Sequence, residues 1–174
     1  MNHEIKYLNC GKLLKEKVKN EIDEIVHVVK LIKWEKEFKV IKKDKKTKKN
    51  KTILHQEAYN NRFEKEFLKL GWEKNPFLSR DPRLIGDFGK NLVFGEIQFG
   101  NSATLYRDFY KFQYGHRNGL VSMCVLIVPV NPQEFFPTRS EKSITNMAEY
   151  DLALRYFTIL PISTPTMVIG LIRG

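Results

Sequence analysis

The sequence has few cysteines and no long apolar segment. Its two cysteines, Cys10 and Cys124, are spaced for neither a disulfide framework nor a zinc site. The apolar run Val125–Val130 is interrupted by Pro129 and is far too short to span a membrane. The N-terminal residues mix Lys, Glu and single apolar residues without the apolar core of a signal peptide. We therefore expect a cytoplasmic protein with reduced thiols and no membrane partner.

Acidic residues are too few to balance the basic ones, and the surplus lies near the N-terminus. Lys and Arg number 30 and Asp and Glu 20, which gives a formal net charge of +10. Residues 1–51 hold 16 lysines against 8 acidic residues, whereas residues 52–174 hold 14 basic and 12 acidic residues. This surplus favours a polyanionic partner, and nucleic acid is the better candidate than an anionic membrane surface.

The length of 174 residues suits a single domain, and 42% hydrophobic residues suffice for a core. Within residues 1–174 we distinguish a lysine-rich N-terminal portion over 1–54 and a core over 55–174. In the N-terminal portion, apolar residues recur every three or four positions from Gly11 to about Glu37. This spacing predicts one long amphipathic helix.

The segment Lys42–Lys51 is nearly uninterrupted lysine. Charge runs of this kind are normally solvated, mobile loops. Such a loop can still hold DNA phosphates without reading bases, because its contribution to binding is counterion release. We therefore predict phosphate contacts from Lys45, Lys46, Lys48 and Lys49.

The order of the remaining elements predicts an α/β fold with a mixed central β-sheet and helices on both faces. The expected elements are a helix over His55–Leu70, a β-hairpin, a helix from Asn101 or Ser102 to about Gly115, a buried strand over Leu120–Val130, a helix from Ser143 to about Arg155 and a strand over Thr166–Ile172. In the helix after the hairpin, Leu105, Phe109 and Phe112 share one face, and Lys111 is expected on another.

The predicted β-hairpin carries two acidic residues and an amide. Apolar runs Leu84–Phe88 and Leu92–Phe99 flank a short polar turn. Asp87 lies in the first run, and Glu96 lies in the second with Gln98 two residues on, so that Glu96 and Gln98 project to the same side.

Carboxylates in such apolar strands need a partner, since a buried unpaired carboxylate is costly. One interpretation places these side chains on the solvated face of an edge hairpin. The other is a site for a divalent cation such as Mg²⁺, which takes oxygen ligands from one or two carboxylates and leaves room for a substrate phosphate. Glu57 and Asp81 are weaker candidate ligands, because one suits a helix start and the other precedes a proline.

The two halves of the hairpin, Ile-Gly-Asp-Phe-Gly-Lys and Glu-Ile-Gln-Phe-Gly-Asn, carry Asp and Glu nine residues apart. They resemble the core of the BglII/BstYI-like type II restriction endonucleases, which belong to the PD-(D/E)XK nuclease superfamily and have Glu-x-Gln where most relatives have Glu-x-Lys. The resemblance extends from about Gln56 to the C-terminus. It includes the aromatic helix Asn101–Gln113, the strand Leu120–Val130, Phe136-Pro137, Met147–Tyr150 and Val168–Ile172, in the order of the family.

The resemblance implies a restriction-endonuclease-like core that hydrolyses phosphodiester bonds in double-stranded DNA as part of a restriction–modification system. Asp87 and Glu96 would be catalytic carboxylates and metal ligands, and the Ile97 carbonyl would be a further ligand of Mg²⁺. Gln98 would take the place of the lysine. An amide is neither a cation nor a general base, so its role would be hydrogen bonding to the water or the phosphate.

The same resemblance implies where DNA bases are read. Asn101 and the loop Thr138, Arg139 and Ser140 occupy the positions that enter the grooves. Arg139 suits the O6 and N7 of guanine and Asn101 suits adenine, although Arg139 could instead bind phosphate and Asn101 could cap its helix. Cutting both strands of a palindrome needs two sites related by a twofold axis, which implies a homodimer.

Two other functions remain open at this point. One is a repair or junction endonuclease on the same core. The other is a basic, non-catalytic DNA-binding module in which the acidic residues are structural.

Overall fold

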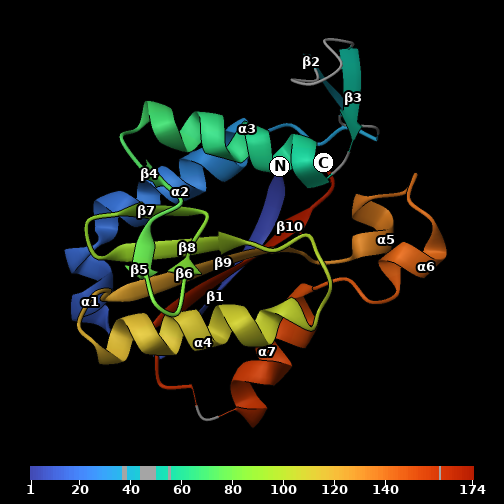
Figure 1. Cartoon of the computed structure of the whole chain (residues 1–174). Coiled ribbons are helices and arrows are strands. Elements are labelled where there is room, and N and C mark those ends of the chain that lie inside the picture. Colours follow the sequence, from blue (N-terminus) through green and yellow to red (C-terminus); the bar gives the residue numbers. More distant parts are fainter. Residues whose placement is uncertain (37–38, 44–49, 55, 161) are drawn as a thin grey trace.

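A six-stranded mixed β-sheet forms the centre of the molecule in a computed structural model, which describes all residues except 37–38, 44–49, 55 and 161 (Figure 1). The strand order is β1-β10-β9-β8-β7-β4. The strands are β1 Asn2–Leu8, β10 Thr166–Ile172, β9 Met123–Pro129, β8 Val93–Ile97, β7 Phe88–Lys90 and β4 Glu73–Lys74. Strands β8, β9 and β10 are parallel, and the outer pairings are antiparallel.

Helices cover both faces of the sheet, which confirms the predicted α/β class. On one face lie α2 (Lys19–Leu31) and α3 (Gln56–Lys69), and on the other lie α4 (Thr104–Arg117) and α7 (Tyr150–Ile159) (Figure 1). Each face has its own apolar cluster, because successive strand residues point to opposite sides of the sheet. The short α1 (Lys12–Lys17) precedes α2.

Strand β9 lies between two parallel neighbours, and all its residues are buried. This explains the near-continuous apolar run in the sequence, because a strand covered by helices on both faces needs no polar side. The free thiol of Cys124 is buried in this strand, whereas that of Cys10 is half-buried.

The N-terminal portion differs from the single helix that we predicted. Strand β1 pairs antiparallel with β10, and its residues alternate between exposed and half-buried positions. The predicted helix is two helices, α1 and α2, separated at Val18, and it ends at Leu31 rather than near Glu37. Alternation over so few residues is a weak signal for a strand until a neighbouring strand is available to pair with it.

The lysine-rich segment is partly strand. β2 (Lys39–Lys43) and β3 (Asn50–Leu54) form an antiparallel pair in which Lys42 lies opposite Lys51. This β2–β3 hairpin stands away from the central sheet beyond α3 (Figure 1). The ends of the predicted loop are therefore ordered by pairing. Lys45, Lys46, Lys48 and Lys49 lie outside the described residues.

The predicted helix from Ser143 to Arg155 is wrong. The structure has a short helix α6 (Glu141–Ile144), an irregular segment over 145–149, and then α7. The irregular segment pairs with the chain that follows β8, through the Ser102 N–H to the Asn146 carbonyl at 2.7 Å and the Ala148 N–H to the Gly100 carbonyl at 2.9 Å. These long-range hydrogen bonds replace those that a continuous helix would have made.

Three short elements complete the fold. Strands β5 (Phe77–Ser79) and β6 (Leu84–Ile85) pair with each other outside the central sheet, and helix α5 (Pro132–Phe135) follows β9. Among the described residues, no helix is both long enough and apolar enough to cross a membrane.

Candidate active site

Strands β7 and β8 form the predicted hairpin, with a turn at different residues. Phe88 lies opposite Gly95 and Lys90 opposite Val93. The connection is therefore Asn91 and Leu92 rather than Gly89 to Asn91. Asn91 has a φ of 52°, the left-handed conformation that short hairpin turns need and that Asn tolerates well.

Two glycines set how closely the segments of the hairpin approach. A Cβ atom at Gly95 would lie 2.1 Å from the ring of Phe88, and one at Gly86 would lie 2.4 Å from the ring of Phe94. Each aromatic ring thus fills the space above a glycine on the segment opposite. This packing holds Asp87, which lies between Gly86 and Phe88, beside the end of β8.

The Asp87 carboxylate is tied to the backbone of β8. Its Oδ2 accepts a hydrogen bond from the Ile97 N–H at 2.7 Å, and its own N–H donates to the Gly95 carbonyl at 3.0 Å. Asp87 is exposed, whereas Glu96 is 5% exposed. The structure therefore brings Asp87, Glu96 and Ile97 together, with Asp87 at the solvent side.

The partner of Glu96 is a buried lysine from helix α4. Lys111, which is 3% exposed, forms an ion pair with Glu96 Oε1. Its Nζ also lies 2.9 Å from Asp108 Oδ1 and 3.2 Å from the Ile85 carbonyl oxygen. Because a buried charge is stable only when it is paired and hydrogen-bonded, these oxygens account for the position of the ammonium group.

The Gln98 amide joins the same group of side chains. Its Nε2 donates to Asp108 Oδ2 at 2.7 Å, and its Oε1 accepts from the Gly100 N–H at 2.9 Å. Glu96 and Gln98 are therefore connected through Lys111 and Asp108. The solvated-face interpretation of the hairpin is wrong for Glu96, since its charge is buried and paired inside the protein.

Burial and neighbouring carboxylates raise the pKa of Glu96 well above its usual range. Desolvation is the largest cause, followed by repulsion from Asp87 and Asp108, and Lys111 opposes both. Desolvation also raises the pKa of Asp87, with repulsion from Asp108, against the hydrogen bond from the Ile97 N–H, the charge of Lys111 and a hydrogen bond with Glu96. Because the pKa of Glu96 is raised further, Glu96 is the group that governs the dependence on pH.

The donor set suits a hard divalent cation. Asp87 and Glu96 supply two carboxylates, and the Ile97 carbonyl can supply a third oxygen. Among the described residues there is no group of three or more His, Cys, Asp or Glu side chains placed to hold a metal ion. Mg²⁺ does not require one, because it keeps waters and substrate oxygens and takes only one or two carboxylates from the protein.

We expect Mg²⁺ to stabilise the protein more as the pH rises through the raised pKa of Glu96. A raised carboxyl pKa means that the folded state binds the proton more tightly than the unfolded state does. The stabilisation that this proton provides is therefore lost as the pH rises through the folded-state pKa. The ionised Glu96 is then free for a cation, whose binding should raise the Tm by several degrees. Thermal unfolding with and without Mg²⁺ measures this. Glu96→Gln should show no pH-dependent gain, and an equal gain in that variant would contradict the prediction.

The predicted base-reading residues lie on both sides of Met147. Asn101 forms an isolated β-bridge with Met147, and an Nη of Arg139 lies 3.9 Å from the Met147 sulfur. The Asn101 side chain accepts from the Ala103 N–H at 2.8 Å, ahead of the start of α4. Thr138 and Ser140 are exposed beside Arg139. The structure thus places Asn101 and Arg139 near each other and close to the chain that follows Gln98.

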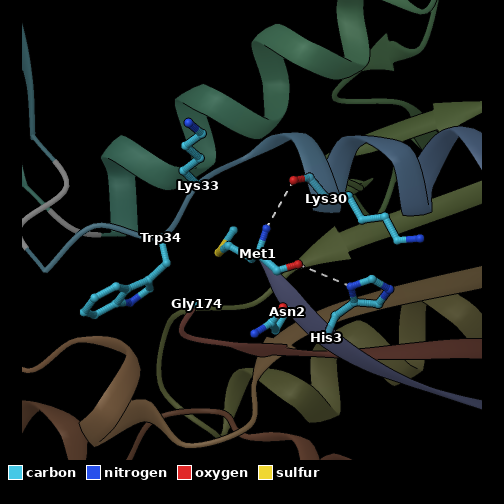
Figure 2. Close-up of a pocket in the computed structure, with 7 residues that line it drawn as sticks. All are labelled: Met1, Asn2, His3, Lys30, Lys33, Trp34 and Gly174. Carbon is cyan, nitrogen blue, oxygen red and sulfur yellow. Dashed lines mark hydrogen bonds between the residues drawn. The ribbon is translucent and has the colours of Figure 1, made fainter.

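The weaker candidate ligands do not add to this site. Glu57 and Asp81 are exposed, and among the described residues neither joins Asp87 and Glu96 in a group that could hold a metal ion. A pocket of 710 Å³ is lined by Met1, Asn2, His3, Lys30, Lys33, Trp34 and Gly174, shown in Figure 2. None of the residues predicted for the site lines this pocket.

Asp108 and Lys111 are the site residues that we did not predict from the sequence. Both follow Leu105 at intervals of three, so they lie beside the apolar stripe of α4. Charged residues at such positions usually extend into solvent, which is why the sequence predicts Lys111 on another face. Burial of Asp108 and Lys111 becomes favourable because Glu96 lies under the helix and Lys111 pairs with both carboxylates.

A mixed sheet with two carboxylates at the ends of adjacent strands, covered by helices on both faces, is the architecture of a nuclease core of the restriction-endonuclease class. The family described as restriction endonuclease BglII/BglIII matches residues 3–171. The chain belongs to this family of site-specific deoxyribonucleases.

Solved structures agree with this assignment at the level of the fold. The chain is similar to restriction endonuclease BglII complexed with a DNA 16-mer, with a TM-score of 0.75 and 17% identity over 100% of this chain and 78% of that one. It is also similar to free BglII, with a TM-score of 0.65 and 18% identity over 100% of this chain and 81% of that one. No curated protein sequence matches the chain.

Proposed function

We propose that this protein is a Mg²⁺-dependent type II restriction endonuclease that cuts both strands of a short palindromic DNA site. The observation that carries the proposal is the arrangement of Asp87, Glu96 and Ile97 at adjoining strand ends, in a chain of this family. It acts in the cytoplasm, within a restriction–modification system. Residues 1–174 act as one domain, since β1 from the N-terminal portion pairs with β10 of the core.

The side chains of the site divide the work of phosphodiester hydrolysis. When bound, Mg²⁺ supplies Lewis acidity to the phosphate and lowers the pKa of the attacking water. Asp87, Glu96 and the Ile97 carbonyl would hold the cation. Glu96 would also orient or deprotonate the attacking water. Gln98 donates a hydrogen bond to the water or the phosphate, and its amide is already oriented by Asp108 and Gly100.

DNA contacts come from both sides of this centre. Asn101 and Arg139 read base edges, Thr138 and Ser140 contact the DNA next to Arg139, and Lys45, Lys46, Lys48 and Lys49 contact phosphates. The positions of Asn101 and Arg139 on either side of Met147 support this assignment.

A palindromic site requires a homodimer, because each of its two identical half-sites presents one scissile bond. Sedimentation analysis of the protein with its DNA site should give a protein mass twice the 20.5 kDa of one chain. A single copy on each cut site would contradict the twofold arrangement.

A plasmid digest with Mg²⁺ tests the function. Discrete bands with identical ends, found by sequencing the digested DNA, are the expected result. Nicking that depends on DNA structure rather than on sequence would support a repair or junction endonuclease. Absence of cleavage by pure, folded protein that binds DNA would support a non-catalytic binding module. Protein carrying Asp87→Asn, purified in the same way, controls for contaminating nucleases.

A further inference from the structure

Helix α4 places the Lys111 ammonium beside the buried Glu96 carboxylate. Lys111 is 3% exposed and reaches three oxygens: Glu96 Oε1, Asp108 Oδ1 at 2.9 Å and the Ile85 carbonyl at 3.2 Å. An ammonium group has three N–H donors. Two of them donate to Glu96 Oε1 and to the Ile85 carbonyl, and the ammonium also forms an ion pair with Asp108. Lys111 is buried among these protein oxygens, so it acts on the reaction through Glu96 rather than by contact with DNA.

Only one Glu96 oxygen is engaged by Lys111. The ion pair fixes the rotation of the carboxylate and leaves its second oxygen for the cation. In a site where a misplacement of about 1 Å can cost roughly 10²-fold in rate, this constraint has a large effect.

Asp108 connects this cation to Gln98. It is fully buried and lies in contact with Lys111 through Oδ1 and with the Gln98 amide through Oδ2. Its charge attracts the Lys111 ammonium in an ion pair, and its Oδ2 accepts the hydrogen bond from Gln98 Nε2. Asp108 therefore holds the lysine in place and at the same time determines which way the Gln98 amide points.

We propose that Lys111 and Asp108 are positioning residues of this nuclease, with Lys111 fixing the Glu96 carboxylate and Asp108 fixing both Lys111 and Gln98. The motif strand itself supplies an amide at Gln98, and α4 supplies the orienting cation. The inference rests on the proposed function, since it concerns the site that would hold Mg²⁺ and DNA.

The decisive variant is the double substitution Lys111→Met with Asp108→Asn. Each single substitution leaves an uncompensated buried charge and is expected to destabilise the fold. The double variant removes one positive and one negative charge, so the net charge near Glu96 is unchanged. Because Glu96 still loses its cation, we expect the Tm of the double variant to lie above that of either single variant and below that of the wild type.

Cleavage by the double variant distinguishes a positioning role of Lys111 and Asp108 from a purely structural one. With Glu96 no longer oriented, the double variant should cleave about 10²-fold more slowly in single turnover, although its DNA affinity in Ca²⁺ stays within about threefold. A pair that serves only the fold would recover cleavage together with the Tm, and a double variant that cleaves at the wild-type rate overturns the proposal. Lys69→Met, which breaks the ion pair with the buried Glu66 on α3, is the matched control and should cleave normally.

Two further measurements keep the test decisive. Mn²⁺ titration without DNA should show affinity about tenfold weaker in the double variant, because Glu96 has lost the ion pair that orients it although the net charge of the site is unchanged. Unchanged Mn²⁺ affinity in the double variant would contradict the positioning role, whether or not the wild type cuts DNA. If the wild type cuts no DNA, that result alone contradicts only the restriction function. If the double variant does not fold, Lys111→Arg decides. It keeps the charge but has a different shape, so the rate should fall at least tenfold, and an unchanged rate would overturn the proposal.

Discussion

Asp87→Asn should lower Mg²⁺-dependent cleavage by about 10³-fold or more while DNA binding in Ca²⁺ persists. Loss of one charge-stabilising group in an active site costs on the order of 10²–10³-fold, and we propose that the same group also holds the cation. The asparagine oxygen can still accept the hydrogen bond from the Ile97 N–H, which Asp87 accepts at 2.7 Å. The hairpin should therefore remain folded. Single-turnover cleavage and binding to the same DNA fragment measure the two effects.

Asp81→Asn is the matched control for this variant. Asp81 is an exposed carboxylate in the loop before the hairpin, and its substitution removes the same charge at a short distance along the chain. We expect wild-type cleavage from it. Wild-type cleavage from Asp87→Asn would remove Asp87 from the mechanism, and loss of Ca²⁺-supported binding would show that Asp87 serves DNA binding instead.

Replacing Lys45, Lys46, Lys48 and Lys49 with glutamine should weaken specific and random DNA binding alike, by up to about 10³-fold at low salt. Each phosphate contact contributes about 0.9 to the slope of log K against log salt concentration. The slope should therefore become shallower by as much as about 3.6 if all four lysines reach phosphates. Binding isotherms for both DNAs at several salt concentrations give the slopes.

The control removes the same charge from another surface. Lys12, Lys15, Lys17 and Lys19 lie on or beside α1, which is far from the β2–β3 hairpin (Figure 1). Their replacement by glutamine should leave most of the salt dependence in place. An equal effect from both sets would mean that net charge, rather than local contact, governs binding. A loss confined to the specific site would instead make the lysine-rich segment a reader of sequence.

Much of the fold could be predicted because its elements have strong local signals. Strand β10 has the bounds predicted for it, and β9 lies within the predicted strand, since each is an apolar run that is buried in the sheet. Helix α3 follows a clear apolar stripe and ends near Gly71, whose φ is +77°. These patterns do not depend on distant parts of the chain.

The errors occur where distant segments decide the local structure. Strand β1 exists because β10 offers an edge, and the helix expected after Ser143 is interrupted because its residues hydrogen-bond to the chain around Gly100. In both cases the local pattern is ambiguous, and the long-range partner determines which structure forms.

The sequence alone determined the class of fold, through the order of its elements, and the grouping of Asp87, Glu96 and Gln98, because these three residues are local to one hairpin. Only the tertiary structure placed Lys111 and Asp108 beneath Glu96. A lysine and an aspartate at helical spacing look like a solvated pair until the helix is packed on the sheet. Burial then forces each charge to find a partner, and the available partners are the polar groups of the motif strand.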